Sequence, residues 1–144
     1  MNKEDVKILL IEDNEGDIVL TLQALKEAKV VNVVYVVKDG EEALKYLRKE
    51  GSYNDEETPG LILLDINLPR LDGIAVLAEI KNDAAFMTIP VVMLTTSNAE
   101  KDIMESYRHH ANCYITKPVD YQKFMDVVLA IKDFWINIVK LPEH

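Results

Sequence analysis

Four short apolar runs that each end in polar residues are the feature that most constrains how this chain folds. The runs are residues 6–11, 61–64, 91–94 and 113–116. Runs this short, bounded by turn residues, are typical of buried strands in a parallel sheet. Ligands of open α/β sheets bind in the crevice beyond the carboxyl ends of the strands. We therefore expect the polar residues after the runs to meet at one edge of the sheet: Glu12, Asp13, Asp65, Thr95 and Lys117.

Helical patterns alternate with these runs along the chain. A fifth apolar run covers residues 33–37. A turn at 14–17 leads into a helix whose apolar side is predicted to consist of Ile18, Leu22, Leu25 and Ala28. Further helices are predicted to follow Asp39 and Asp120 and to cover residues 74–80 and 98–110. Strands that alternate with helices are joined by parallel crossovers, which predicts an α/β fold, a three-layer sandwich.

The composition disfavours several classes of function. The chain has 144 residues, 49% of them hydrophobic, and a formal net charge of −9. One domain with a single core is expected at this length. Binding to nucleic acid or to a membrane surface needs clustered Lys and Arg, which this charge disfavours. The one cysteine, Cys113, excludes an internal disulfide and fits a reducing compartment. We expect a cytoplasmic protein with no signal peptide, membrane span or effector domain.

The three carboxylates predicted to meet at the sheet edge indicate a metal site. Glu12, Asp13 and Asp65 carry too much negative charge to lie close together without a cation. A hard ion such as Mg²⁺ accepts carboxylate oxygens and keeps several waters, so it would relieve the repulsion. Asn67 lies two residues beyond Asp65 and is placed to offer its backbone carbonyl to the metal.

The same residues predict phosphoryl-transfer chemistry at Asp65. An aspartate beside Mg²⁺ can attack phosphorus, because the metal neutralises charge on the incoming phosphoryl oxygens. Lys117 would act as a second positive group on those oxygens, and Thr95 would donate a hydroxyl. A single polar residue after a strand is commonly an ordinary loop residue. Five such residues at the correct strand ends argue against that interpretation.

Four motifs in this order give the chain a specific resemblance. They are Ile-Glu-Asp-Asn at 11–14, Leu-Asp-Ile-Asn-Leu-Pro at 64–69, Leu-Thr-Thr-Ser at 94–97 and Ile-Thr-Lys-Pro at 115–118. With their spacing, they resemble the receiver domain of two-component response regulators over nearly the whole chain. The resemblance implies a flavodoxin-like (βα)5 fold with a doubly wound, five-stranded parallel sheet. It also implies a single receiver domain over residues 1–144, with the last helix extended at about 133–144.

The resemblance assigns roles to individual residues. It implies that Asp65 accepts phosphate from a sensor histidine kinase, while Glu12 and Asp13 bind Mg²⁺. Many receivers carry Asp where this chain has Glu12, whose longer side chain should still reach the metal. Thr95 and Tyr114 would form the switch pair, and the Lys117–Pro118 peptide bond would be cis.

A narrower resemblance concerns the partners. Three features resemble small single-domain regulators paired with bacterial phytochrome kinases. They are Gly16-Asp17 after the first motif, the polar loop at 50–60 and the ending at 134–142. Such a protein signals by phosphorylation-dependent protein contact and catalyses only its own phosphorylation and dephosphorylation, so it is not expected to be an enzyme. Onward transfer to a histidine phosphotransfer protein remains open.

Two other classes of protein use similar residues. A phosphatase or phosphotransferase of the haloacid dehalogenase type also has an aspartate nucleophile and Mg²⁺. That class needs a second acid two residues after the nucleophile, where this chain has Asn67, and an amide cannot act as a general base. A nucleotide or flavin binder would need a glycine-rich turn after the first strand. Residues 13–17 contain one glycine and three acids instead.

The last helix is apolar on more than one side. One stripe, suited to packing on the sheet, comprises Phe124, Val127, Val128, Ile131, Trp135 and Ile138. Met125, Leu129 and Ile136 lie largely off that stripe. We predict that they form an interface in a homodimer through the last helices, because a two-fold dimer uses one patch twice. The alternative is that residues 134–142 fold back and cover this side.

Overall fold

The computed structural model describes residues 7–30, 32–96, 105 and 107–130. Its elements, in chain order, are β1 (Ile8–Ile11), α1 (Glu15–Glu27), β2 (Val34–Val37), α2 (Gly40–Leu47), the short 3₁₀ helix η2 (Gly51–Tyr53), β3 (Leu61–Asp65), α3 (Gly73–Lys81), β4 (Val91–Thr95), β5 (Cys113–Thr116) and α5 (Tyr121–Ala130). In these ranges, each helix is too short or too polar to cross a bilayer.

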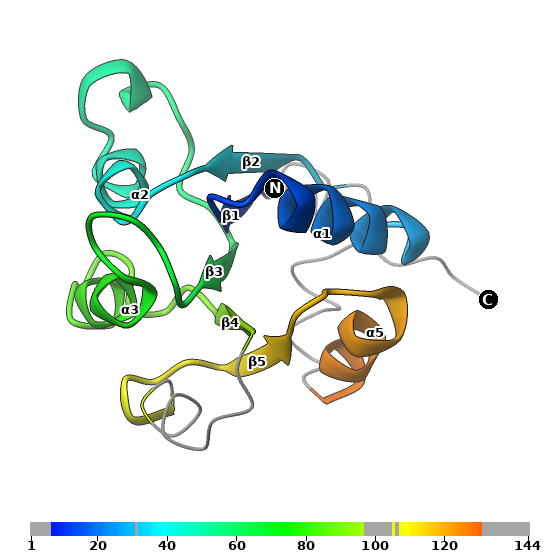
Figure 1. Cartoon of the computed structure of the whole chain (residues 1–144). Coiled ribbons are helices and arrows are strands. Elements are labelled where there is room, and N and C mark those ends of the chain that lie inside the picture. The colour runs from blue at the N-terminus through cyan, green and yellow to red at the C-terminus, as the bar shows by residue number, and fades with distance from the viewer. Residues whose placement is uncertain (1–6, 31, 97–104, 106, 131–144) are drawn as a thin grey trace.

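The five strands form one parallel sheet in the order β2-β1-β3-β4-β5. The prediction of a doubly wound α/β fold is confirmed. The chain order reverses between β1 and β3, so these strands are neighbours although β2 lies between them in sequence (Figure 1). Residues that follow β1 and β3 therefore meet at the carboxyl edge of the sheet, where open sheets of this type bind ligands.

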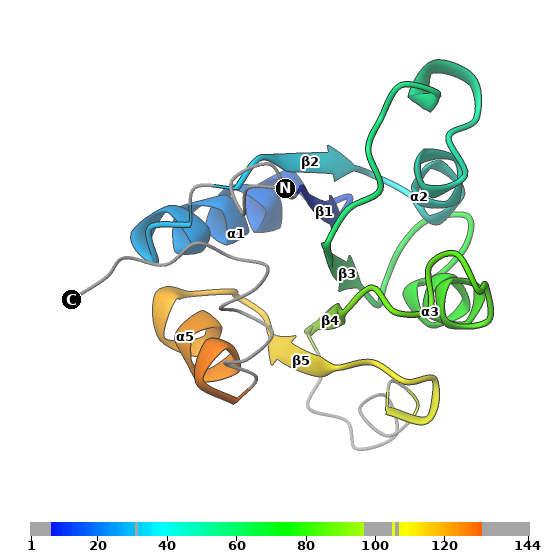
Figure 2. The same ribbon diagram turned by 180° about the vertical axis from the view of Figure 1, so that it is seen from behind.

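Helices cover both faces of the sheet and complete the three layers. The two views show α1 and α5 side by side on one face, and α2 and α3 on the other (Figures 1 and 2). Alternate residues of β1 serve the two faces: Ile8 and Leu10 pack with α1 and α5, while Leu9 and Ile11 pack with α2 and α3. Burying each such side chain contributes about 1.5–3 kcal/mol, so a register slip would be costly.

Side-chain caps begin the helices near the carboxyl edge of the sheet. The carboxylate or amide oxygens of Asn14, Asp39, Asp72 and Asp120 accept hydrogen bonds from the backbone N–H groups three residues later. Such caps satisfy donors at a helix N-terminus that have no partner within the helix. The predicted helix start at Asp120 is thereby confirmed, and the loops after β1 and β5 each end at a fixed helix start.

The predicted apolar side of α1 is partly wrong. Leu22 is 37% exposed, and Thr21 is buried in its place beside Ile18, Ala24 and Leu25. At 3.6 residues per turn, the buried stripe is centred on Thr21, and Leu22 lies just beyond its edge, next to Ile18. The sequence pattern favoured large apolar residues and therefore selected Leu22 in place of Thr21.

Two other predictions fall largely or wholly outside the described residues. Of the helix predicted at 98–110, the structure describes residues 105, 107 and 108 as helical and 109–110 as a turn. The extension predicted at about 133–144 lies entirely outside the described residues.

At the strand ends, β3 and β4 each run one residue further than predicted, so Asp65 and Thr95 are the last residues of their strands.

Candidate functional site

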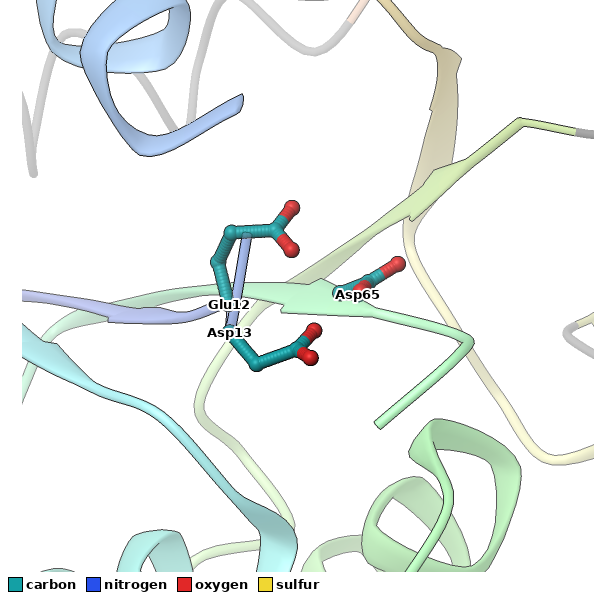
Figure 3. Close-up of side chains that lie close together, drawn as sticks. All are labelled: Glu12, Asp13 and Asp65. Carbon is teal, nitrogen blue, oxygen red and sulfur yellow. The ribbon is translucent and has the colours of Figure 1, made fainter. Parts of the chain in front are cut away.

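Three carboxylates converge at the carboxyl edge of the sheet. Glu12 and Asp13 follow β1, and Asp65 ends the neighbouring strand β3. One carboxylate oxygen from each lies within 4.8 Å of the others. Figure 3 shows the three side chains close together. Glu12 and Asp65 are buried, whereas Asp13 is exposed, so the cluster opens to solvent on the side of Asp13.

Backbone groups orient the two buried acids. The Asn14 N–H donates to Oε2 of Glu12 at 3.2 Å, and the Asn67 N–H donates to Oδ1 of Asp65 at 3.3 Å. Gly73 packs directly behind the end of β3, where a Cβ would lie 2.1 Å from the Asp65 carbonyl oxygen. Only glycine fits this close approach, so α3 begins directly against the strand end that carries Asp65.

Lys117 brings one positive charge into the cluster. Its Nζ atom lies 2.6 Å from Oε1 of Glu12, 3.1 Å from Oδ1 of Asp65 and 3.0 Å from Oδ2 of Asp17. The lysine side chain is only 7% exposed. Its backbone N–H donates to the Thr95 carbonyl at 2.6 Å, which continues the pairing of β5 with β4. The Lys117–Pro118 peptide bond that follows is cis.

Burial and the neighbouring charges alter the ionisation of this cluster. Burial, with smaller contributions from Asp65, raises the pKa of Glu12 to about 7, although Lys117 and the Asn14 N–H act in the opposite direction. Burial alone would lower the pKa of Lys117. Its contacts with Glu12, Asp17 and Asp65 outweigh burial and hold that pKa above its ordinary value, so the lysine stays charged.

The donor set fits a hard divalent cation. All three acids have carboxylate oxygens, which are the ligand atoms that Mg²⁺ and Mn²⁺ prefer in proteins. Oε1 of Glu12 is fully buried, and it is paired with Lys117 Nζ at 2.6 Å without meeting the angle of a hydrogen bond. One lysine therefore serves two buried acids, and a cation beside them would add the positive charge that their close approach favours.

The raised pKa of Glu12 predicts how stability depends on pH without metal. Between its ordinary pKa of 4.5 and about 7, folded Glu12 holds a proton that the unfolded chain has lost. The folded state then binds more protons, so stability falls as pH rises through this window. We expect the melting temperature in EDTA to fall by on the order of 5 °C from pH 4.5 to 7.5. Glu12→Gln should remove most of this fall, and an unchanged fall would contradict the assignment.

The remaining predicted site residues lie at or near this edge of the sheet and differ in how far they are buried. Thr95 is buried at the end of β4, next to β5. Tyr114 in β5 is half-buried, and its ring centroid lies 6.0 Å from that of Tyr107, which is exposed. The Asn67 side chain is exposed. Whether its carbonyl would bind metal stays a prediction.

The predicted dimer residues are only partly covered by the structure. Met125 is half-buried and packs against the core on the α1 and α5 face. The side chain of Leu129 and the whole of Ile136 lie outside the described residues. Their role in an interface therefore stays a prediction.

Asp17 also contacts this cluster, and the sequence does not predict it at the site. The sequence indicates a turn at 14–17 and a resemblance carried partly by Gly16-Asp17, yet the Asp17 carboxylate contacts Lys117. Asp17 lies one helical turn before the buried Thr21, so it is on the side of α1 that faces the sheet. A helix stripe that allowed polar residues would have placed it there.

Comparison with known proteins agrees with the fold and the site. The family model described as the response regulator receiver domain matches residues 8–129. The chain belongs to this family. Receiver domains are signalling modules that bind a divalent metal, and phosphorylation-dependent signalling is the role of the family. The comparisons give no support to the haloacid dehalogenase alternative.

Individual relatives show which response regulators this chain resembles. The response regulator Rcp1 of Synechocystis sp. is 42% identical, over 94% of this chain and 92% of that protein. A solved structure of the phosphorylated cyanobacterial phytochrome response regulator RcpA is 48% identical, with a TM-score of 0.79, covering 96% of this chain and 99% of RcpA. The Mn²⁺-bound form of Rcp1 is 41% identical, with a TM-score of 0.78 and the same coverage. The predicted similarity to phytochrome-associated regulators is thereby confirmed.

Proposed function

We propose that Asp65 accepts a phosphoryl group from a sensor histidine kinase and that the chain signals through protein contacts that depend on this group. The observation that carries the proposal is the position of the Asp65 carboxylate. It is buried at the end of β3, 3.1 Å from the Lys117 ammonium, beside two further acids that suit a divalent metal. Membership of the receiver family supports the same assignment.

In the proposed reaction, a carboxylate oxygen of Asp65 forms a bond to phosphorus. The bond between phosphorus and the imidazole nitrogen of the kinase phosphohistidine breaks, and its electron pair stays on that nitrogen. Lys117 balances negative charge on the phosphoryl oxygens. Glu12, Asp13, Asp65 and the carbonyl of Asn67 would hold Mg²⁺, which supplies further positive charge when bound.

We further propose that Thr95 and Tyr114 carry the signal from the site. A phosphoryl group on Asp65 would offer a charged acceptor to the Thr95 hydroxyl and draw it inward. The half-buried Tyr114 ring would then gain space on the side of Thr95. Because the phosphoryl group interacts differently with the two arrangements, it shifts the balance between them.

The proposed kinase partner is of the phytochrome type, because RcpA, which is similar to this chain over nearly its whole length, is a cyanobacterial phytochrome response regulator. The chain would then act in the cytoplasm as a phosphoacceptor and not as an enzyme on other substrates, without binding nucleic acid or membranes. Onward transfer to a histidine phosphotransfer protein is compatible with the same chemistry.

Homodimerisation through the last helices is part of the proposal. It rests on the apolar residues Met125, Leu129 and Ile136. Sedimentation of the wild type and of a Leu129→Glu, Ile136→Glu double variant tests it. A wild type that stays monomeric with and without beryllofluoride would refute the dimer.

A phosphotransfer experiment tests the kinase assignment. A phytochrome-type histidine kinase is labelled on its histidine with radioactive ATP and mixed with the wild-type chain or with Asp65→Asn. We expect the label to move to the wild type and to remain on the kinase with the variant. As a control, acetyl phosphate should phosphorylate the same wild-type sample. If it does so while the label remains on the kinase, this class of kinase is excluded as the partner.

A further inference from the structure

Asp17 is a fourth carboxylate that contacts the site, and it comes from α1 rather than from a strand end. Its Oδ2 atom accepts a hydrogen bond from Lys117 Nζ at 3.0 Å. The two residues are 100 positions apart in sequence. This contact ties the beginning of α1 to the loop that carries Lys117.

The backbone of Asp17 is held in place independently of its carboxylate. Its N–H donates to Oδ1 of Asn14 at 2.9 Å, which caps α1, and the Asn14 N–H in turn donates to Glu12. A substitution that changes only the Asp17 side chain therefore leaves this cap intact. Because the start of α1 is fixed by its cap, the carboxylate of Asp17 stays directed toward Lys117.

The Lys117 ammonium has three N–H donors and three carboxylates around it. When Asp65 is phosphorylated, the donor that it now accepts can pass to the phosphoryl group. A further donor reaches the phosphoryl oxygens only if the lysine gives up Glu12 or Asp17. The side chains of Glu12 and Asp65 are 0% and 2% exposed, whereas that of Asp17 is 27% exposed. Water can replace the lysine at Asp17 but not at the buried Glu12, so Asp17 is the partner that can be released at least cost.

We propose that Asp17 is a positioning residue that holds one N–H donor of the Lys117 ammonium in the unphosphorylated site and releases it to the phosphoryl group. This inference deepens the proposed function and rests on phosphorylation of Asp65. Asp17 competes with the phosphoryl oxygens for the same donor. It thereby sets how readily the lysine becomes available to the incoming group.

Asp17→Asn tests the competition, because it keeps the shape of the side chain and removes its charge. Initial rates of phosphorylation are measured against acetyl phosphate concentration in Mg²⁺. We expect the half-saturating concentration to fall about fivefold, as for loss of an ion pair of moderate strength. The change should appear in this concentration rather than in the saturated rate. Asp17→Glu should restore the wild-type value.

Glu15→Gln is the matched control. Glu15 lies in the same first turn of α1 and pairs with Lys38 instead of Lys117, with 71% of its side chain exposed. It should leave the half-saturating concentration unchanged. An equal fall in both variants would mean that general negative charge is responsible, and no fall in Asp17→Asn would mean that Asp17 does not compete. Either result overturns the proposal.

A thermal double-mutant cycle tests the Asp17–Lys117 pair without any phosphodonor. Asp17→Asn should lower the melting temperature by about 3 °C in the wild type and should have no such effect when Lys117 is already replaced by Met. If Asp17→Asn lowers the melting temperature equally in the wild type and in Lys117→Met, the pairing is overturned, whichever residue is phosphorylated. If the two residues are coupled but Asp65 is not phosphorylated, the result counts against the proposed function instead.

Discussion

Replacing Asp13 with Ala is expected to abolish Mg²⁺ binding and phosphorylation together. Asp13 is the exposed member of the three acids, so its carboxylate faces the open side by which an ion would enter. Removing it leaves two buried carboxylates that share one lysine. Loss of groups that only orient metal ligands already costs 10–100-fold in metal affinity, so loss of a ligand should cost roughly 100-fold or more. Because Asp13 is exposed, the fold should remain intact.

Titration calorimetry with Mg²⁺ and phosphorylation by acetyl phosphate measure the two effects. Asp55→Ala is the control, because Asp55 is an exposed acid in the loop between η2 and β3. It should change neither quantity. An Asp13→Ala variant with wild-type affinity for Mg²⁺ would show that the metal binds elsewhere.

Thr95→Ala is expected to accept phosphate yet lose the response of Tyr114. Thr95 lies at the end of β4 and supports Lys117 through its backbone carbonyl, which the substitution keeps. Only the hydroxyl is removed, and the proposed switch depends on that hydroxyl. Thr95→Ser keeps it and serves as the control.

Ring resonances of Tyr114, followed by NMR with and without beryllofluoride and Mg²⁺, report this response. In the wild type and in Thr95→Ser, the resonances should shift when the beryllofluoride adduct forms. In Thr95→Ala, most of that shift should be lost. A shift of wild-type size in Thr95→Ala would refute the coupling.

The sheet and the acidic cluster could be predicted because both follow from local patterns. Short apolar runs fix the strands, and parallel strands bring their carboxyl ends to one edge, so Glu12, Asp13 and Asp65 had to approach one another. Strand bounds differ by a residue at Asp65 and Thr95. Neither difference changes the edge at which these residues lie.

The contact of Asp17 with Lys117 was missed because it depends on how α1 is rotated on the sheet. A stripe of large apolar residues selected Leu22, whereas the structure turns Thr21 toward the sheet and carries Asp17 with it. Small and polar residues can face a core when close packing or a partner favours them. Only the packed structure shows the lysine that Asp17 contacts.

The most direct test of the central claim is the site of phosphorylation. The wild type and Asp65→Asn are incubated with acetyl phosphate and Mg²⁺, and their intact masses are compared. We predict that the wild type gains the mass of one phosphoryl group and that Asp65→Asn gains none. Equal phosphate uptake by both proteins would contradict the assignment of Asp65 as the phosphoacceptor.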